Sequence, residues 1–120
     1  MAVFNSMFPV LPGKEDAARE WIAQLAGPRK EGFDALQQRS DIARETLTLQ
    51  ESPGGSFLLF WFEGDVEKAF AAVIGGDDEF TAWHRERLRD VTGIDLAQAA
   101  GGPPPETLLD WRAPAPAQTA

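Results

Sequence analysis

The sequence contains no cysteine and no tyrosine, and it has one histidine among its 120 residues. Without cysteine the chain can form no disulfide, no thiolate nucleophile and no cysteine-based zinc site. A single histidine also disfavours other zinc sites, since these take several nitrogen or sulfur ligands. We therefore expect no metal site, and a cytoplasmic location is the default expectation.

Positive charge is scarce as well. Eleven Lys and Arg residues stand against nineteen Asp and Glu residues, which gives a formal net charge of −8. Nucleic-acid phosphates require a basic surface, so a nucleic-acid partner is not expected. No apolar run approaches the roughly 20 residues that span a bilayer. The first residues also lack the basic region and long apolar core of a signal peptide. We expect no membrane partner.

Several catalytic signatures are missing. The chain has no Gly-x-Gly-x-x-Gly motif, no P-loop and no Gly-x-Ser-x-Gly motif. Nucleotide-dependent chemistry and serine hydrolysis are therefore disfavoured.

Large apolar side chains are plentiful, with eight Phe and four Trp. They are densest in the segment 56–63, where both alternating sets are apolar: Phe57, Leu59 and Trp61 in one, Leu58, Phe60 and Phe62 in the other. Side chains alternate across a strand, so this segment predicts a central strand covered on both faces. Helices can cover one face. A chain this short has little material for the other, so the simplest second cover is another copy of the chain.

The remaining periodicity predicts three further strands and several helices. The strands are expected over 2–10, 44–51 and 107–111, and the helices over 14–26, 29–39, from a cap at Asp65, and from a cap at Asp77 or Asp78 to about Val91. This order predicts an α+β fold of the ferredoxin-like type, a four-stranded antiparallel sheet with helices on one face. Residues 1–112 form the predicted domain, and the Ala/Pro-rich residues 113–120 a disordered tail. A face-to-face homodimer would cover the bare side of the sheet.

Short motifs in this order also resemble a known family. They are Pro9-Val10-Leu11-Pro12-Gly13-Lys14, Gly27-Pro28-Arg29, Arg44-Glu45, Gln50-Glu51-Ser52-Pro53, residues 78–83, Gly93-Ile94-Asp95-Leu96 and the closing Pro-Glu-Thr-Leu-Leu-Asp-Trp. The chain is similar over about residues 3–112 to the small dimeric α/β-barrel proteins of the DUF6176 type.

That resemblance implies a dimeric α/β barrel, but no established reaction, because the family is uncharacterised. Its wider superfamily includes cofactor-free antibiotic-biosynthesis monooxygenases, polyketide cyclases, haem-degrading proteins and muconolactone isomerase-like enzymes. The chain departs from the family pattern twice: Thr92 stands where a histidine usually precedes Gly-Ile-Asp-Leu, and His84 stands where an aromatic residue usually follows Trp83. Any role of the missing histidine cannot be carried over.

His84 and Glu45 are the candidate catalytic residues. His84 lies on the apolar stripe of its helix, so it is either a core histidine or a general acid/base with a pKa suited to neutral pH. Haem ligation by His84 stays open. Glu45 shares its strand parity with Leu47 and Leu49, so it either points toward the helices or lies at the rim.

Five further residues are candidates for substrate binding. Asn5 interrupts an apolar strand, and Arg44 belongs to a polar row on the strand face opposite to that of Glu45. Three tryptophans could wall an aromatic pocket or simply pack in the core: Trp21, Trp61 and Trp83.

The resemblance to this superfamily implies, by analogy, one of two functions: a small cofactor-free enzyme of secondary or aromatic metabolism that works by proton transfer, as a cyclase, isomerase or monooxygenase-like protein, on an apolar cyclic or polyketide-like substrate. His84 would be its acid/base, and Glu45 or Asn5 would orient the imidazole or polarise a carbonyl. The other is a non-catalytic homodimer that binds a small molecule or serves assembly.

Overall fold

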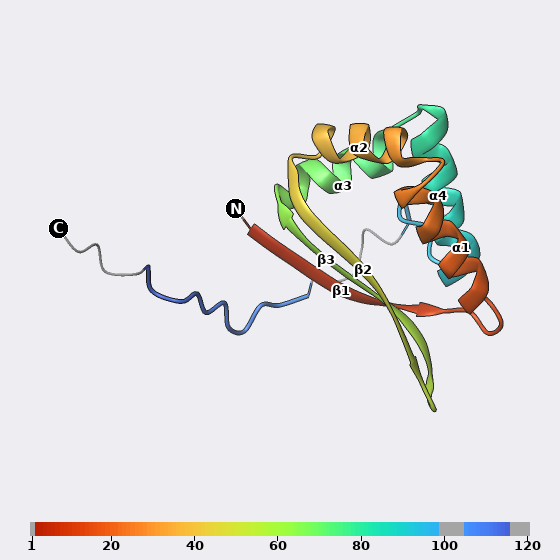
Figure 1. The fold of residues 1–120 in the computed structure, drawn as a ribbon, viewed down its shortest axis with the longest axis horizontal. Helices are drawn as coiled ribbons and strands as arrows, with labels where there is room; N and C mark the ends of the chain where they lie inside the picture. Colours follow the sequence, from red (N-terminus) through yellow and green to blue (C-terminus); the bar gives the residue numbers. More distant parts are fainter. Residues whose placement is uncertain (1, 99–104, 116–120) are drawn as a thin grey trace.

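The computed structural model describes residues 2–98 and 105–115. In these residues the chain forms a three-stranded antiparallel sheet with four helices gathered on one side of it (Figure 1). The order along the chain is β1 (Ala2–Val10), α1 (Glu15–Ala26), α2 (Lys30–Arg39), β2 (Ile42–Ser52), β3 (Gly55–Gly64), α3 (Val66–Gly75) and α4 (Glu79–Thr92). The α+β class is confirmed, and a ferredoxin-like arrangement is compatible with this order.

The aromatic segment forms β3, and β3 is the middle strand of the sheet, between β1 and β2. The prediction of a central strand is therefore confirmed. Phe62 lies between Phe4 of β1 and Glu45 of β2, while Trp61 lies between Asn5 and Thr46. Since neighbouring residues of a strand point to opposite faces, these two rows mark the two sides of the sheet.

The helices begin and end at residues that the sequence marks. The Asp65 carboxylate accepts a hydrogen bond from the Lys68 backbone N–H at 3.0 Å, and Asp78 accepts one from Thr81 at 3.1 Å. Both are N-caps, and at the second site Asp78, not Asp77, is the cap. Gly93 ends α4 in the left-handed region with φ of 75°, a conformation that glycine adopts without steric cost.

The core lies between the helices and one face of the sheet. Helix α1 contributes Trp21 and α4 contributes Val91, each 1% exposed. Leu58 of β3 belongs to the same buried cluster and joins these helices to the sheet. A second cluster joins Leu25, Leu36 and Phe80 from α1, α2 and α4. Burial of apolar side chains on this face provides the main driving force that holds the helices to the sheet.

In the part of the chain that the structure describes, no helix lies on the opposite face of the sheet (Figure 1). Met7 is 58% exposed there, and Phe57, Leu59 and Trp61 are only partly buried. The expectation that both faces of β3 are covered is thus met on one face in a single chain. We refer to this side of the sheet, which includes Asn5, Met7, Phe57, Leu59 and Trp61, as the open face.

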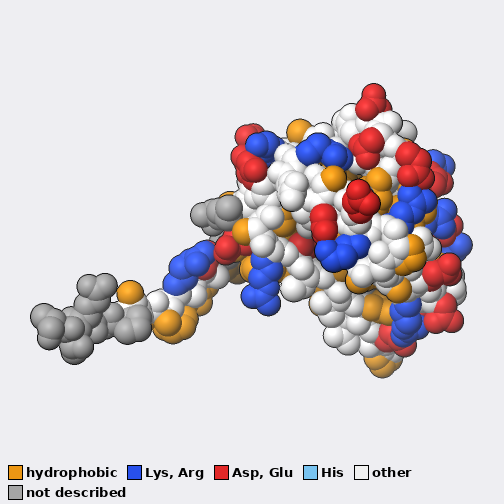
Figure 2. Space-filling model, turned by 45° about the horizontal axis from the view of Figure 1, so that its top comes forward, with side chains coloured by type: hydrophobic (Ala, Val, Ile, Leu, Met, Phe, Trp, Pro, Cys, Tyr) orange, Lys and Arg blue, Asp and Glu red, His pale blue; other side chains and the backbone are white. Residues whose placement is uncertain are grey.

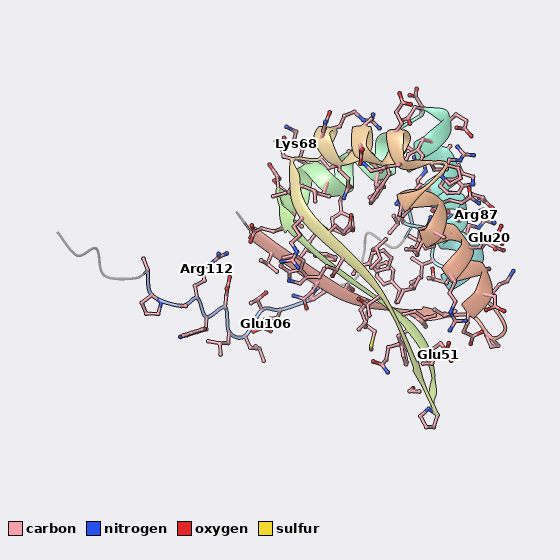
Figure 3. All side chains as sticks on the ribbon, in the orientation of Figure 1. Glu20, Glu51, Lys68, Arg87, Glu106 and Arg112 are labelled. Atoms are coloured by element: carbon pink, nitrogen blue, oxygen red, sulfur yellow. The ribbon has the colours of Figure 1, made fainter. Side chains whose placement is uncertain are left out.

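The predicted last strand at 107–111 is wrong for this single chain. These residues have no strand structure, and Leu108, Leu109 and Trp111 are 86%, 82% and 73% exposed. The segment passes a hollow at Val3, Phe4 and Asn5 of β1, and then leads away from the helices (Figures 1 and 3). Leu108 and Leu109 line that hollow together with Val3 and Phe4, yet both stay largely exposed, so the contact buries little apolar surface.

The surface of the body carries interspersed acidic and basic side chains, and hydrophobic side chains recur on the projecting C-terminal segment (Figure 2). None of the helices in the described part of the chain is long and apolar enough to cross a membrane. Of the predicted disordered tail, residues 113–115 are exposed and without regular structure, and residues 116–120 lie outside the described residues.

Candidate functional site

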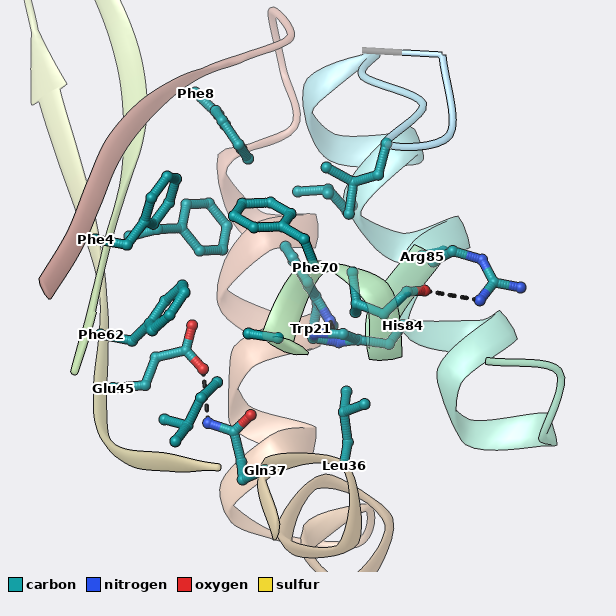
Figure 4. Close-up of a pocket in the computed structure, with 16 residues that line it drawn as sticks. Phe4, Phe8, Trp21, Leu36, Gln37, Glu45, Phe62, Phe70, His84 and Arg85 are labelled. Atoms are coloured by element: carbon teal, nitrogen blue, oxygen red, sulfur yellow. Dashed lines mark hydrogen bonds between the residues drawn. The ribbon is translucent and has the colours of Figure 1, made fainter. Parts of the chain in front are cut away.

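A cavity of about 80 Å³ lies between the helices and the covered face of the sheet (Figure 4). Its wall is mostly aromatic and aliphatic, with four residues that can form directed polar contacts besides Trp21. The lining residues are Phe4, Phe8, Trp21, Leu36, Gln37, Ile42, Glu45, Phe60, Phe62, Ala69, Phe70, Val73, His84, Arg85, Leu88 and Leu96. Both predicted catalytic residues therefore face the same space, Glu45 from the sheet and His84 from α4.

His84 is held by an aromatic enclosure. The ring centroids of Trp21, Phe33 and Phe80 lie 5.3, 5.9 and 5.6 Å from the imidazole, and the Phe80 ring stacks on it at an interplanar angle of 16°. Phe80 precedes His84 by four residues, so one helical turn brings the two rings together.

The hydrogen bond to His84 fixes its tautomer. The indole Nε1–H of Trp21 donates to Nδ1 of His84 at 3.2 Å. Because Nδ1 accepts, the proton of the neutral imidazole must be on Nε2. Within residues 2–98 and 105–115 no group accepts a hydrogen bond from Nε2, so this N–H remains as a donor for a ligand.

Burial lowers the pKa of His84 from 6.5 to about 4. Of the two alternatives for His84, this shift favours the core histidine over the general acid/base, because the aromatic enclosure disfavours the charged imidazolium. At pH 7 the residue is a neutral hydrogen-bond donor and not a ready acid/base. The cavity it faces is also too small for haem.

Glu45 has the opposite shift. Burial raises the pKa of the Glu45 carboxyl above its ordinary value of 4.5, and a hydrogen bond from Gln37 partly counteracts this. Gln37 Nε2 donates to Glu45 Oε1 at 2.7 Å, which fixes the carboxyl at the cavity wall. A carboxyl with a raised pKa is a stronger base than an exposed one once it is ionised. Glu45 is thus the proton acceptor best suited to this cavity.

Arg85 lines the cavity without supplying it with a positive charge. Its Nη1 donates to the backbone carbonyls of Val73 at 2.9 Å and Gly76 at 2.5 Å, at the end of α3. Figure 4 shows its guanidinium directed away from the aromatic rings around Glu45. The guanidinium satisfies carbonyls that a helix end leaves without partners.

The structure separates the predicted substrate-binding residues. Trp21 lines the cavity, but Asn5, Trp61 and Arg44 lie together on the open face, where the Arg44 guanidinium is 5.6 Å from the Trp61 ring. Trp83 is not among the cavity residues; the Arg29 guanidinium lies 4.3 Å above its ring. Within one chain, therefore, Asn5 cannot orient His84 or polarise a ligand beside it.

The position at which the family pattern has histidine carries a structural residue here. Thr92 is 3% exposed; its hydroxyl donates to the Leu88 carbonyl at 2.7 Å and accepts from the Ile94 N–H at 3.1 Å. These bonds satisfy the end of α4 and leave no group for a ligand.

Gln37 and Arg85 are site residues that sequence reasoning missed. Gln37 belongs to a helix with a mostly polar sequence, and nothing in the local pattern singles it out. Arg85 follows His84 in a run of charged residues that resembles a solvated face.

Comparison with known proteins adds no identification: no family model, no curated protein and no solved structure matches the chain. In the described residues no cluster of three or more His, Asp or Glu side chains is arranged to hold a metal ion. The resemblance to the DUF6176 type stays an expectation.

Proposed function

We propose that the protein is a small cofactor-independent enzyme that moves a proton on an apolar cyclic substrate. The observation that carries this proposal is one aromatic cavity lined by a carboxyl with a raised pKa and a neutral imidazole that has a free N–H donor. Cyclisation, isomerisation and oxygenation that begins with deprotonation are the reactions this pairing serves, as expected for secondary or aromatic metabolism.

In this proposal Glu45, and not His84, is the general base, and His84 acts as a hydrogen-bond donor. The Glu45 carboxylate takes a proton from the carbon next to a carbonyl, and the C–H electron pair moves into an enolate. The Nε2–H of His84 donates a hydrogen bond to the enolate oxygen, where negative charge develops. Gln37 holds the carboxyl in place, and Trp21 keeps the imidazole proton on Nε2.

Exchange of hydrogen for deuterium tests this without knowledge of the substrate. We expect the protein to accelerate exchange at the carbons next to the carbonyl of cyclohexanone in D₂O, followed by proton NMR. Glu45→Gln should lower the rate about 100-fold, as loss of a general base does. Glu20→Gln is the matched control, because Glu20 is exposed on α1 and directed away from the cavity (Figure 3). Equal rates in buffer, in the wild type and in both variants would contradict an enzyme that acts through Glu45.

The open face supports the second part of the proposal, a homodimer with the two sheets face to face. Apolar side chains occupy its centre: Met7 is exposed, and Phe57, Leu59 and Trp61 are only partly buried by residues 2–98 and 105–115. Native mass spectrometry should give twice the chain mass, and Met7→Lys should shift it to the monomer while the fold is retained. A wild-type monomer would contradict the dimer.

The alternative function is a homodimer that binds a small molecule or assembles without turnover. The cavity favours ligand binding in either case, and the exchange assay separates the two functions. Absence of a cofactor stays an expectation from the resemblance, and a cytoplasmic location stays an expectation from composition.

A further inference from the structure

We infer that the cavity between the sheet and the helices takes a neutral ligand of one ring that carries an oxygen, with that oxygen hydrogen-bonded to Nε2 of His84. This inference rests on the proposed function in one respect: it assigns a substrate class to the same cavity. It concerns what the cavity admits, and it stands on the size, charge and hydrogen-bonding groups of the wall.

The size of the cavity limits the ligand to a single ring. An engineered apolar cavity of about 150 Å³ takes up benzene. The space here is about 80 Å³, so one ring already needs some movement of the wall, and a fused second ring exceeds it. Gln37 and Ile42 also line a surface hollow of about 740 Å³, so only these side chains need to move for a ligand to enter at that end.

The wall favours an aromatic or unsaturated ring. Phe4, Phe62 and Phe70 form a cluster with centroid separations of 5.1, 5.1 and 6.4 Å, and two of the contacts are tilted and one edge-on. Rings at such separations gain from further ring contacts in the same geometries. Phe8 and Phe60, 4.9 Å apart, extend this surface along the sheet.

The charges of the wall exclude an anion. Among the cavity residues Arg85 is the sole cation, and its guanidinium is bonded to the Val73 and Gly76 carbonyls. Glu45 repels an anion whenever it is ionised. A carboxylate or phosphate ligand would therefore lose its hydration without gaining a countercharge, which is costly in a low-dielectric site.

The hydrogen-bonding groups also disfavour a cation. The Nε2–H of His84 needs an acceptor, since Nδ1 is already bonded to the Trp21 indole. An ammonium group has no acceptor to offer. A hydroxyl or carbonyl oxygen accepts from Nε2, and a hydroxyl can also donate to the Glu45 carboxyl. Only the neutral oxygen-bearing ring satisfies every group at once.

Five probes of graded charge and size test the inference: benzyl alcohol, toluene, benzoate, benzylamine and 2-naphthalenemethanol. The chain has one histidine, so its imidazole ¹⁵N signals need no assignment by mutation. Titration at pH 7 should show benzyl alcohol binding at least tenfold tighter than the other four, with a larger shift at Nε2 than at Nδ1.

A variant separates the His84 contact from general packing. In His84→Asn the side-chain oxygen can replace Nδ1 as the acceptor for Trp21, but the amide N–H does not extend to the position of Nε2. We expect tenfold weaker binding of benzyl alcohol and unchanged binding of toluene, with Glu20→Gln behaving as the wild type. Tryptophan fluorescence verifies that each variant is folded.

Several results would overturn the inference: tighter binding of benzoate or benzylamine, tighter binding of the two-ring alcohol, no change at the imidazole signals, or no binding of any probe. The ketone exchange assay reports separately on the proposed function. Exchange that depends on Glu45 together with preferred binding of benzoate would retain the enzyme and refute the ligand class. Preferred binding of benzyl alcohol without ketone exchange would retain the ligand class and refute the proposed enzyme.

Discussion

The stability of the protein should fall in mild acid because of one side chain, His84. In the unfolded chain this histidine takes up a proton near pH 6.5, whereas in the folded protein it does so at about pH 4. Between these values the unfolded chain binds more protons than the folded one, so acid favours unfolding. The stabilisation is complete above pH 6.5, declines as the pH falls toward 4, and is constant below that.

The magnitude follows from the two pKa values. One pKa unit corresponds to about 1.4 kcal/mol, so full expression of the shift would remove about 3 kcal/mol of unfolding free energy. The imidazole is partly accessible, which lessens the cost of charging it, and we expect a loss of about 2 kcal/mol. This is a large part of the few kcal/mol by which a domain of this size is stable.

Urea unfolding of the wild type and His84→Asn at intervals from pH 7.5 to pH 4 measures this loss. Glu45 and the surface carboxylates titrate in both proteins, so the difference between the two curves isolates His84. The difference should change by about 2 kcal/mol in favour of the variant as the pH falls. A difference that is independent of pH would refute a buried neutral imidazole, and so would a histidine ¹⁵N titration with its midpoint near 6.5.

Three further changes test other contacts. Glu45→Gln should raise the unfolding temperature by about 3 °C at pH 8 and leave it unchanged at pH 4, since the raised pKa makes ionisation of Glu45 cost stability as the pH rises; equal effects at both pH values in thermal scans would contradict this. Gly32→Ala should lower the unfolding free energy by about 1–2 kcal/mol in urea, because a Cβ there would lie 2.6 Å from Phe80 Cδ2; a stabilised variant would mean that the ring yields freely. Asp78→Ala should lower the unfolding free energy by about 1 kcal/mol at pH 7, because it removes the N-cap of α4. The loss should be smaller in acid, where the Asp78 carboxyl becomes protonated; hydrogen bonds with Thr81 hold the pKa of this carboxyl below 3.8. Asp77→Ala is the control and should leave the unfolding free energy unchanged.

Much of the fold was predictable because alternation and capping are local signals. The apolar residues on both parities of 56–63 predicted β3 at the centre of the sheet, Asp65 marked one helix start, and another was predicted at Asp77 or Asp78. The parity of Glu45 with Leu47 and Leu49 left two positions open, toward the helices or at the rim, and the structure has the first.

The grouping of site residues was not predictable in the same way. Alternation divides a strand into two sets, but pairing between strands decides which sets share a face. Asn5 is opposite Trp61, and Glu45 is opposite Phe62, so the two polar side chains lie on different sides. The contact between Gln37 and Glu45 joins α2 to β2, and such a tertiary contact leaves no periodic trace in the sequence.

A single extra residue in β2 completes the cavity wall. Ile42 is paired with Gly64 and Arg44 with Glu63, so β2 has one more residue than β3 between these two pairs, which is a β-bulge. Such a bulge reverses the alternation of the residues before it. Ile42 and Glu45 are three residues apart, a spacing that would direct them to opposite faces of a regular strand, yet both line the cavity. Without the bulge, one of the two would face the open side. The register of this strand end therefore gives the cavity both its carboxyl and the apolar side chain of Ile42, which it shares with the surface hollow beside it.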